Sequence, residues 1–188
     1  MKRVFIIHGW EGYPEEGWFP WLKQELESRG VQVAIPAMPN PQAPTIIDWT
    51  TYLAEQVGIP DKETFFVGHS IGCQAILRYL ETLPNDTKIG GTVFVAGWIH
   101  LTPTSSNDPV ALPWLETPLQ WEIIRRHVDT CTAIFSDNDE YVPLQDAQIF
   151  EEKLNAEIII EYGKKHFSGS DNVTELPAAL NALLHMIP

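Results

Sequence analysis

The chain has 188 residues, a formal net charge of -13 at pH 7 and a hydrophobic fraction of 44%. This length predicts one domain with enough chain for a sizeable core, and the apolar content excludes a disordered protein. The negative charge argues against nucleic acid and anionic membrane surfaces as partners, because like charges repel.

Short apolar runs alternate with amphipathic segments along the chain. The apolar runs predict six strands: Val4 to Ile7, Val31 to Ile35, Thr64 to Val67, Ile89 to Ala96, Thr132 to Ser136 and Glu157 to Glu161. Apolar residues at helical spacing predict five helices: Trp18 to Leu26, Thr45 to Val57, Ile71 to Leu83, Leu144 to Leu154 and Val173 to Met186. Buried strands joined through helices indicate an α/β fold, with a doubly wound, mostly parallel sheet of about six strands and helices on both faces.

Two passages interrupt this alternation. Four prolines in the segment 36–44 predict an extended loop. Residues 98–129 are too long for an ordinary connection, and they predict a small cap or lid insertion within a single domain over residues 1–188. Among the large apolar side chains of the insertion are Trp98, Leu112, Trp114 and Trp121. These side chains either wall an apolar substrate pocket or pack against the sheet edge as ordinary core residues, and the sequence favours neither.

The most informative motif is Gly68-His69-Ser70-Ile71-Gly72, which lies between a predicted strand and a predicted helix. A G-x-S-x-G in this context is typical of the nucleophile elbow, a sharp turn that presents a serine above the sheet. Glycines suit such a turn because a Cβ at either position would collide with neighbouring backbone. The Ser70 hydroxyl is expected at a helix N-terminus, where free N–H groups favour developing negative charge.

A serine nucleophile needs a base, and that base needs an orienting acid. In this architecture the acid and then the histidine follow the serine along the chain, and His166, just after the last predicted strand, fits that order. Asp137 and Asp139 both follow the strand after the insertion. We favour Asp139, because Asp-x-x-Val-Pro fits a turn in which Pro143 opens the next helix. Asp137 suits a backbone-binding turn, although it stays an alternative acid.

An oxyanion hole would complete the site. Its expected donors are the backbone N–H of Ile71, directly after the nucleophile, and the backbone N–H of Trp10 in the loop after the first strand. Gly9 would allow that loop to approach the substrate closely, and we expect His8 to orient the loop rather than to react.

Two cysteines, Cys73 and Cys131, do not make a disulfide framework, and they predict reduced core residues. The apolar run that follows Lys2 and Arg3 is too short for a signal peptide, and no stretch reaches the length of a membrane-spanning helix. We therefore expect a cytoplasmic protein that does not associate with membranes.

These motifs together resemble the α/β-hydrolase superfamily and, more narrowly, the small serine hydrolases related to retinoblastoma-binding protein 9. The resemblance covers nearly the whole chain and rests on residues 4–10, 18–22, 67–72, 136–143 and 163–167. It implies a compact hydrolase without metal or organic cofactor, in which Ser70 is the nucleophile, Asp139 the acid and His166 the base. The binding partner in the family's name does not carry over, because neither cysteine lies in a Leu-x-Cys-x-Glu motif.

The leading functional prediction is a serine hydrolase, carboxylesterase-like or aminopeptidase-like, that cleaves a small carboxylic ester or short amide through an acyl-enzyme. One alternative is a catalytically weak binding or regulatory protein on the same fold. Another is a thioesterase or acyltransferase. The substrate, the preference for ester or amide, and the oligomeric state stay open.

Overall fold

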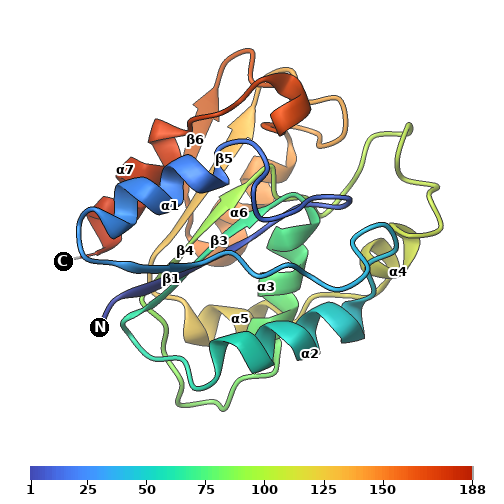
Figure 1. Ribbon diagram of the computed structural model, residues 1–188. Coiled ribbons are helices and arrows are strands. Elements are labelled where there is room, and N and C mark those ends of the chain that lie inside the picture. Colours follow the sequence, from blue (N-terminus) through green and yellow to red (C-terminus); the bar gives the residue numbers. More distant parts are fainter. Residues whose placement is uncertain (188) are drawn as a thin grey trace.

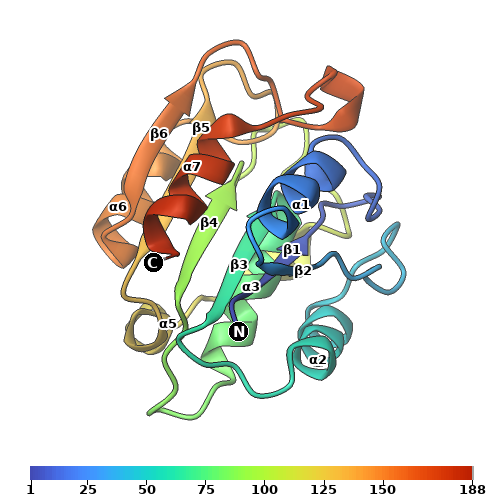
Figure 2. The ribbon, with the colours of Figure 1, turned by 60° about the vertical axis from the view of Figure 1, so that its left-hand side comes forward.

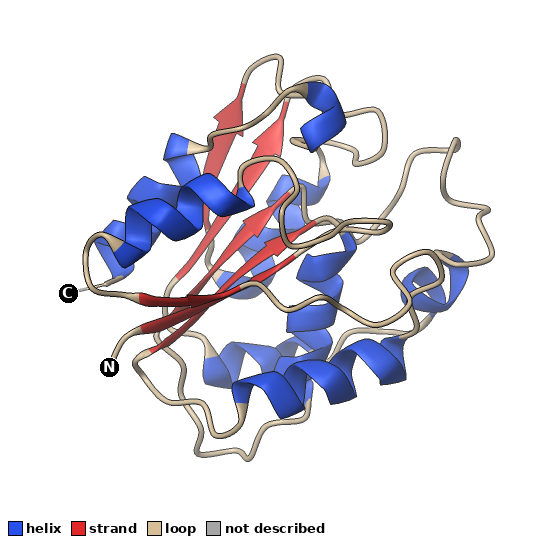
Figure 3. Ribbon diagram, in the orientation of Figure 1, coloured by secondary structure: helices blue, strands red, loops and turns tan. Residues whose placement is uncertain are grey.

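A six-stranded sheet forms the centre of the computed structural model, which describes residues 1–187 (Figures 1 and 3). The strands are β1 (Arg3–Ile7), β2 (Gln32–Ala34), β3 (Thr64–His69), β4 (Gly91–Val95), β5 (Cys131–Ser136) and β6 (Glu157–Glu161). Their order across the sheet is β2-β1-β3-β4-β5-β6, and every neighbouring pair is parallel. The predicted α/β fold is therefore confirmed, with a sheet that is wholly rather than mostly parallel.

Helices cover both faces of this sheet. They are α1 (Phe19–Glu27), α2 (Ile46–Val57), α3 (Ile71–Glu81), α4 (Leu112–Glu116), α5 (Trp121–His127), α6 (Asp146–Leu154) and α7 (Pro177–Met186), with a short 3-10 helix at Gly169–Asp171. α1 and α7 lie together on one face, and α2, α3, α5 and α6 lie on the other (Figure 2). Strands that are apolar along their whole length need both faces buried, and the two layers of helices bury them.

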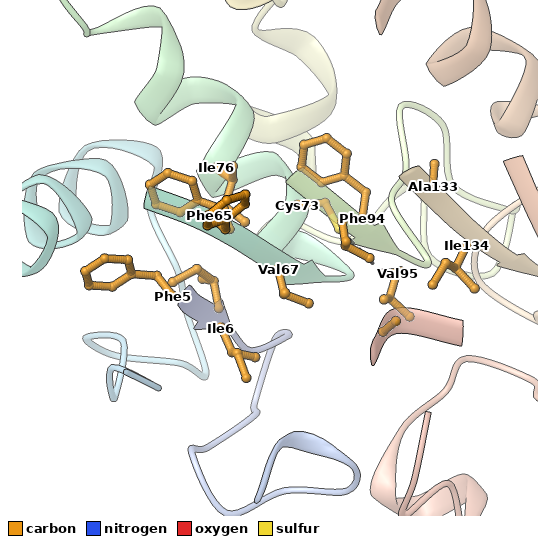
Figure 4. Packing of buried hydrophobic residues seen from close by; sticks show 14 of the residues in the cluster. Phe5, Ile6, Phe65, Val67, Cys73, Ile76, Phe94, Val95, Ala133 and Ile134 are labelled. Atoms are coloured by element: carbon orange, nitrogen blue, oxygen red, sulfur yellow. Dashed lines mark hydrogen bonds between the residues drawn. The ribbon is translucent and has the colours of Figure 1, made fainter. Parts of the chain in front are cut away.

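The core follows from the composition of the strands. All six residues of β3 and of β5 are buried, because both strands are interior and both of their faces meet helices. Buried side chains of β1, β3, β4 and β5 form one cluster with Cys73 and Ile76 of α3 (Figure 4). β6 is only partly buried, because it is an edge strand with a neighbour on one side.

Most predicted bounds agree with the structure to within about two residues, and two stretches differ more. The last helix begins at Pro177 rather than Val173, because the residue before a proline is disfavoured in helical conformation, and Leu176 has φ -137° and ψ 78°. The segment 98–129 contains the two short helices α4 and α5, which the sequence pattern did not predict because prolines interrupt the segment. Within residues 1–187, no helix combines the length and the apolar character that crossing a bilayer requires.

The strand order also determines where a site can form. From β1 the chain first adds β2 on one side, and it then adds β3, β4, β5 and β6 in turn on the other side. The direction in which strands are added therefore reverses between β1 and β3. In open parallel sheets, a crevice forms at such a reversal, outside the carboxyl ends of the strands. The loops after β1 and β3 begin at His8 and Ser70 respectively, so both open into this crevice.

Candidate active site

Ser70 occupies a strained turn between β3 and α3. Its backbone has φ 54° and ψ -123°, which side-chain-bearing residues rarely adopt and which costs roughly 1–3 kcal/mol. A backbone hydrogen bond from the Ser70 N–H to the Val95 carbonyl, 2.9 Å long, ties the turn to the end of β4. The strain is the signature of a nucleophile elbow, which holds the hydroxyl away from the sheet.

The two glycines of the motif are required by close backbone contacts. A Cβ on Gly68 would lie 2.8 Å from the backbone nitrogen of Cys73, and a Cβ on Gly72 would overlap the carbonyl oxygen of Ile7. Neither neighbour can move without displacing α3 or β1. The sequence motif therefore reflects packing of the elbow against its own helix and against the first strand.

His166 and Asp139 contact each other directly. The Nδ1 of His166 lies 2.8 Å from the Oδ2 of Asp139, and the other carboxylate oxygen accepts the backbone N–H groups of Tyr141 at 2.8 Å and Val142 at 3.1 Å. The carboxylate accepts hydrogen bonds, so the imidazole proton lies on Nδ1 and the Nε2 lone pair is free. The Asp139 side chain is only 2% exposed, which shields this pair from water.

Asp137 has a different environment. Its carboxylate accepts the backbone N–H of Gly163 at 2.7 Å, and the residue is exposed. It therefore binds the loop that carries His166 rather than the His166 ring. This arrangement favours Asp139 as the acid.

Ser70 and His166 line one cavity of about 520 Å³. Its walls come from the loops after β1, β3, β4, β5 and β6, as the sheet reversal predicts. The lining residues are Gly9, Trp10, Glu11, Glu16, His69, Ser70, Ile71, Trp98, Leu101, Ser105, Asp108, Ala111, Tyr141, His166, Ser168 and Ser170.

Of the apolar residues expected in a pocket wall, the structure brings Trp98 to this cavity. Trp114 is buried elsewhere: its Nε1 donates to the Pro44 carbonyl at 3.1 Å, and its ring contacts Trp49. Trp121 packs against Phe150. Neither these two tryptophans nor Leu112 is among the lining residues. For Trp114 and Trp121, the geometry favours the alternative of ordinary packing.

The two residues expected to donate to an oxyanion, Trp10 and Ile71, line the same cavity as Ser70. Ile71 is the first residue of α3, so its N–H precedes the helical hydrogen-bond ladder. Trp10 is held in place by its Nε1, which donates to the Gln42 carbonyl at 3.0 Å. A Cβ at Gly9 would lie 3.1 Å from the Nδ1 of His69, so any larger residue at this position would press on the His69 ring.

His8 fixes the loop beneath these donors. Its Nε2 accepts the backbone N–H of Met38 at 3.1 Å, so the ring proton lies on Nδ1, which donates to the Gly9 carbonyl at 2.8 Å. Burial lowers the pKa of His8 below 6.5, with partial opposition from the Gly9 hydrogen bond. The ring is therefore a neutral strut between the proline-rich loop and the Gly9 turn.

Sequence reasoning missed several residues around the cavity. Tyr141 packs edge-on against His166, with ring centroids 5.0 Å apart, and its position beside Asp139 was the available signal. Glu11, Glu16 and Asp108 add three carboxylates to the wall, and no sequence pattern distinguished them from surface acids. Within residues 1–187, no group of three or more His, Cys, Asp or Glu side chains is arranged to hold a metal ion.

A serine on a strained strand-to-helix turn, in a parallel sheet with a His–Asp contact at the same edge, defines an α/β hydrolase. The comparisons with known proteins agree with this class. The chain belongs to the serine hydrolase family, whose model matches residues 4–185, and it is therefore an enzyme of the hydrolase class.

Two curated relatives and two solved structures are similar to the chain over most of its length. YdeN of Bacillus subtilis (strain 168) is 31% identical over 97% of this chain and 94% of its own, and the crystal structure of that gene product superposes with a TM-score of 0.92. Serine hydrolase RBBP9 of Rattus norvegicus is 24% identical over 82% of this chain and 80% of its own. Est1E of Butyrivibrio proteoclasticus, 18% identical, shares the fold with a TM-score of 0.75 over 99% of this chain and 88% of its own.

Proposed function

We propose that this hydrolase cleaves a small carboxylic ester or a short amide through a Ser70–His166–Asp139 triad. The observation that carries the proposal is the 2.8 Å contact between Asp139 and the Nδ1 of His166, beside the cavity that Ser70 and His166 share. This contact leaves the Nε2 of His166 as the free basic atom. The cavity of about 520 Å³ also suits a small molecule, for which pockets of roughly 300–1,000 Å³ are usual.

The reaction would proceed in two halves. In the first, the Nε2 of His166 takes the hydroxyl proton as the Oγ of Ser70 attacks the substrate carbonyl carbon. The negative oxygen of the tetrahedral intermediate accepts the N–H groups of Trp10 and Ile71, each such donor being worth about 3–4 kcal/mol. His166 then gives its proton to the departing alcohol or amine, and an acyl-Ser70 ester remains.

In the second half, a water molecule takes the place of the leaving group. His166 removes one of its protons, the water oxygen attacks the acyl carbon, and the bond to the Oγ of Ser70 breaks. His166 returns the proton to Ser70, and the carboxylic acid leaves. Asp139 keeps the His166 ring oriented and stabilises its positive charge in both halves.

Covalent labelling of Ser70 tests the proposal. A fluorophosphonate probe is expected to label the wild-type protein at one site, and Ser70→Ala should abolish both labelling and the hydrolysis of p-nitrophenyl acetate. Ser105→Ala is the matched control, because Ser105 lines the same cavity, and it should label as the wild type does. Labelling that survives Ser70→Ala would refute the assignment of the nucleophile.

Two further assays separate the alternatives. No turnover across a panel of p-nitrophenyl esters and aminoacyl amides, together with an unlabelled Ser70, would favour a binding or regulatory protein. For a thioesterase or acyltransferase, acyl-thioester substrates with added alcohol or amine acceptors would give transfer products in place of the free acid. The proposal expects free acid as the main product in both assays.

A further inference from the structure

The loop that carries His166 is strained on both sides of the base. Lys165 has φ 48° and Phe167 has φ 58°, and such left-handed conformations cost side-chain-bearing residues roughly 1–3 kcal/mol each. They persist only where surrounding contacts determine the backbone. The loop contacts therefore show what holds the His166 ring in place.

Four consecutive backbone N–H groups of this loop are bound by side chains. The pairs are Gly163 with Asp137 at 2.7 Å, Lys164 with Ser136 at 3.1 Å, Lys165 with Asn138 at 2.9 Å, and His166 with Asp171 at 3.1 Å. Three of these acceptors come from the end of β5 and the turn after it. Three of the four donors are thus anchored to the same turn that presents Asp139.

The carbonyl side of the loop is bound from elsewhere in the fold. The Nε2 of His69 lies 2.7 Å from the His166 carbonyl oxygen, and the Nε1 of Trp18 donates to the Phe167 carbonyl at 3.0 Å. A carbonyl only accepts, so the Nε2 of His69 carries the proton and donates it. His69 directly precedes Ser70, so this hydrogen bond joins the elbow to the backbone of the base.

We propose that His69 is a positioning residue, whose Nε2–H holds the His166 backbone so that the imidazole stays aligned with Ser70. The role rests on the proposed function, since it assumes that His166 is the base. It explains a histidine at this position of the elbow, where the G-x-S-x-G motif itself allows any residue. The His69 ring does not touch the reacting atoms in this role.

The surroundings of His69 suit a rigid, uncharged strut. The side chain is buried, and its ring packs edge-on against Trp18 and Phe19, with centroids 6.2 and 6.0 Å away. Burial, together with a smaller effect of the nearby His166 ring, lowers the pKa of His69 to about 3, so the ring stays neutral at the pH at which a histidine base works. Neutrality matters because a second positive charge, with ring centroids 5.1 Å apart, would oppose protonation of His166.

Three substitutions at His69 isolate this hydrogen bond. His69→Phe keeps a ring and removes the donor. His69→Asn places an amide near the Nδ1 position, too short to reach the His166 carbonyl, whereas His69→Gln places one near the Nε2 position. In the phenylalanine and asparagine variants we expect fluorophosphonate labelling of Ser70, and kcat on p-nitrophenyl acetate, to fall about 10- to 100-fold while KM changes little. The glutamine variant should recover most of the loss.

His127 supplies a matched control for the loss of a buried histidine. Its Nδ1 lies 2.8 Å from the Thr87 carbonyl, and the ring is fully buried at the far end of α5. His127→Phe should lower Tm by an amount similar to His69→Phe without slowing the labelling of Ser70. Equal slowing by both substitutions, in proportion to their loss of stability, would show that His69 is merely structural.

A spectroscopic readout separates this inference from the proposed function. The Nδ1–H proton of His166, donated to Asp139, should give a strongly deshielded NMR resonance that is absent in His166→Gln. We expect it to broaden or vanish in His69→Asn and to remain in His69→Gln and His127→Phe. An unchanged resonance in His69→Asn contradicts the positioning role, even if no substrate is turned over. Failure of wild-type labelling with an altered resonance would instead count against the proposed function alone.

Discussion

At the scale of single residues, the two aspartates after β5 divide two tasks. Asp139 binds the His166 side chain, whereas Asp137 binds the backbone N–H of Gly163 in the same loop. One carboxylate therefore sets the tautomer of the His166 ring, and the other helps to set the path of its loop. The two aspartates lie two residues apart in the sequence, yet one binds a side chain and the other binds a backbone N–H group.

This division predicts opposite profiles for two isosteric substitutions. Asp139→Asn replaces a charged acceptor by an amide, which favours the wrong His166 tautomer, and kcat on p-nitrophenyl acetate should fall about 10⁴-fold. Asp137→Asn keeps an oxygen that can accept the Gly163 N–H, so kcat should change less than about tenfold while stability falls by roughly 1 kcal/mol. Steady-state kinetics and urea unfolding of both variants measure this. A larger loss of kcat in Asp137→Asn would reverse the assignment.

At the scale of elements, the segment 98–129 is attached to the core at one end and borders the cavity at the other. The buried Arg78 of α3 donates from one terminal nitrogen to the carbonyls of Trp114 and Thr117, both at 2.8 Å. Its guanidinium also lies 5.9 Å from the centre of a Trp114 ring. α4 is thereby fixed to α3, and Trp98 is the tryptophan of the segment that reaches the cavity.

Truncating Trp98 and Trp114 should therefore have different consequences. Trp98→Ala enlarges the cavity, so we expect the ratio of kcat/KM for p-nitrophenyl octanoate over acetate to rise. Trp114→Ala empties a buried site that does not face the cavity, so stability should fall by about 3–5 kcal/mol with this ratio unchanged. Should the alanine variant of Trp114 not fold, Trp114→Phe serves in its place. A changed ratio at Trp114 with an unchanged one at Trp98 would mean that the substrate binds under α4.

The sequence predicted the elements that local patterns encode. Six apolar runs became the six strands, and the predicted helices between them formed, because burial on both faces leaves a direct trace in composition. The elbow was equally visible, since Gly68 and Gly72 are needed by contacts within a few residues or with the adjacent strand. Boundaries failed where one residue decides, as at Pro177.

Long-range side-chain contacts left no such trace. The hydrogen bond from His69 to His166 joins residues 97 positions apart, and nothing in either neighbourhood signals it. Which tryptophan of the insertion faces the cavity depended on Arg78 and on the Pro44 carbonyl, both distant in sequence. The residue types of the site were therefore predictable, whereas the contacts that position them required the fold.

At the scale of the whole molecule, the site is assembled from five loops at one edge of the sheet, and its backbone strain at Ser70, Lys165 and Phe167 is offset by the packed core beneath. Two of the supports are buried neutral histidines. His69 joins the loop that carries His166 to the elbow, and His8 joins the Gly9 turn to the proline-rich loop. The stability of the molecule is thus linked to the protonation of these two buried imidazoles.

This linkage predicts a loss of stability in mild acid. Burial lowers the pKa of His69 from 6.5 to about 3 and also lowers that of His8, so below pH 6.5 the unfolded chain binds protons that the native protein does not. The contribution of these two histidines to the free energy of unfolding is then fully present above pH 6.5. It falls as the pH drops, by about 1.4 kcal/mol per pH unit for each fully shifted histidine. Urea unfolding of the wild type at pH 7, 6 and 5 should show this slope.

His69→Gln isolates one part of that slope, because it removes the titrating group and retains a donor. Its free energy of unfolding should fall less steeply than that of the wild type between pH 6.5 and 5. Carboxylates with shifted pKa values do not affect this pH range. The Thr64 hydroxyl lowers the pKa of Asp61 below 3.8. Burial raises the pKa of Asp171, but its hydrogen bonds outweigh this effect and the pKa is lowered. Their contribution is lost only below about pH 4. Parallel slopes for the two proteins would show that His69 takes up its proton in the native state, and would thereby contradict its proposed role as a neutral strut.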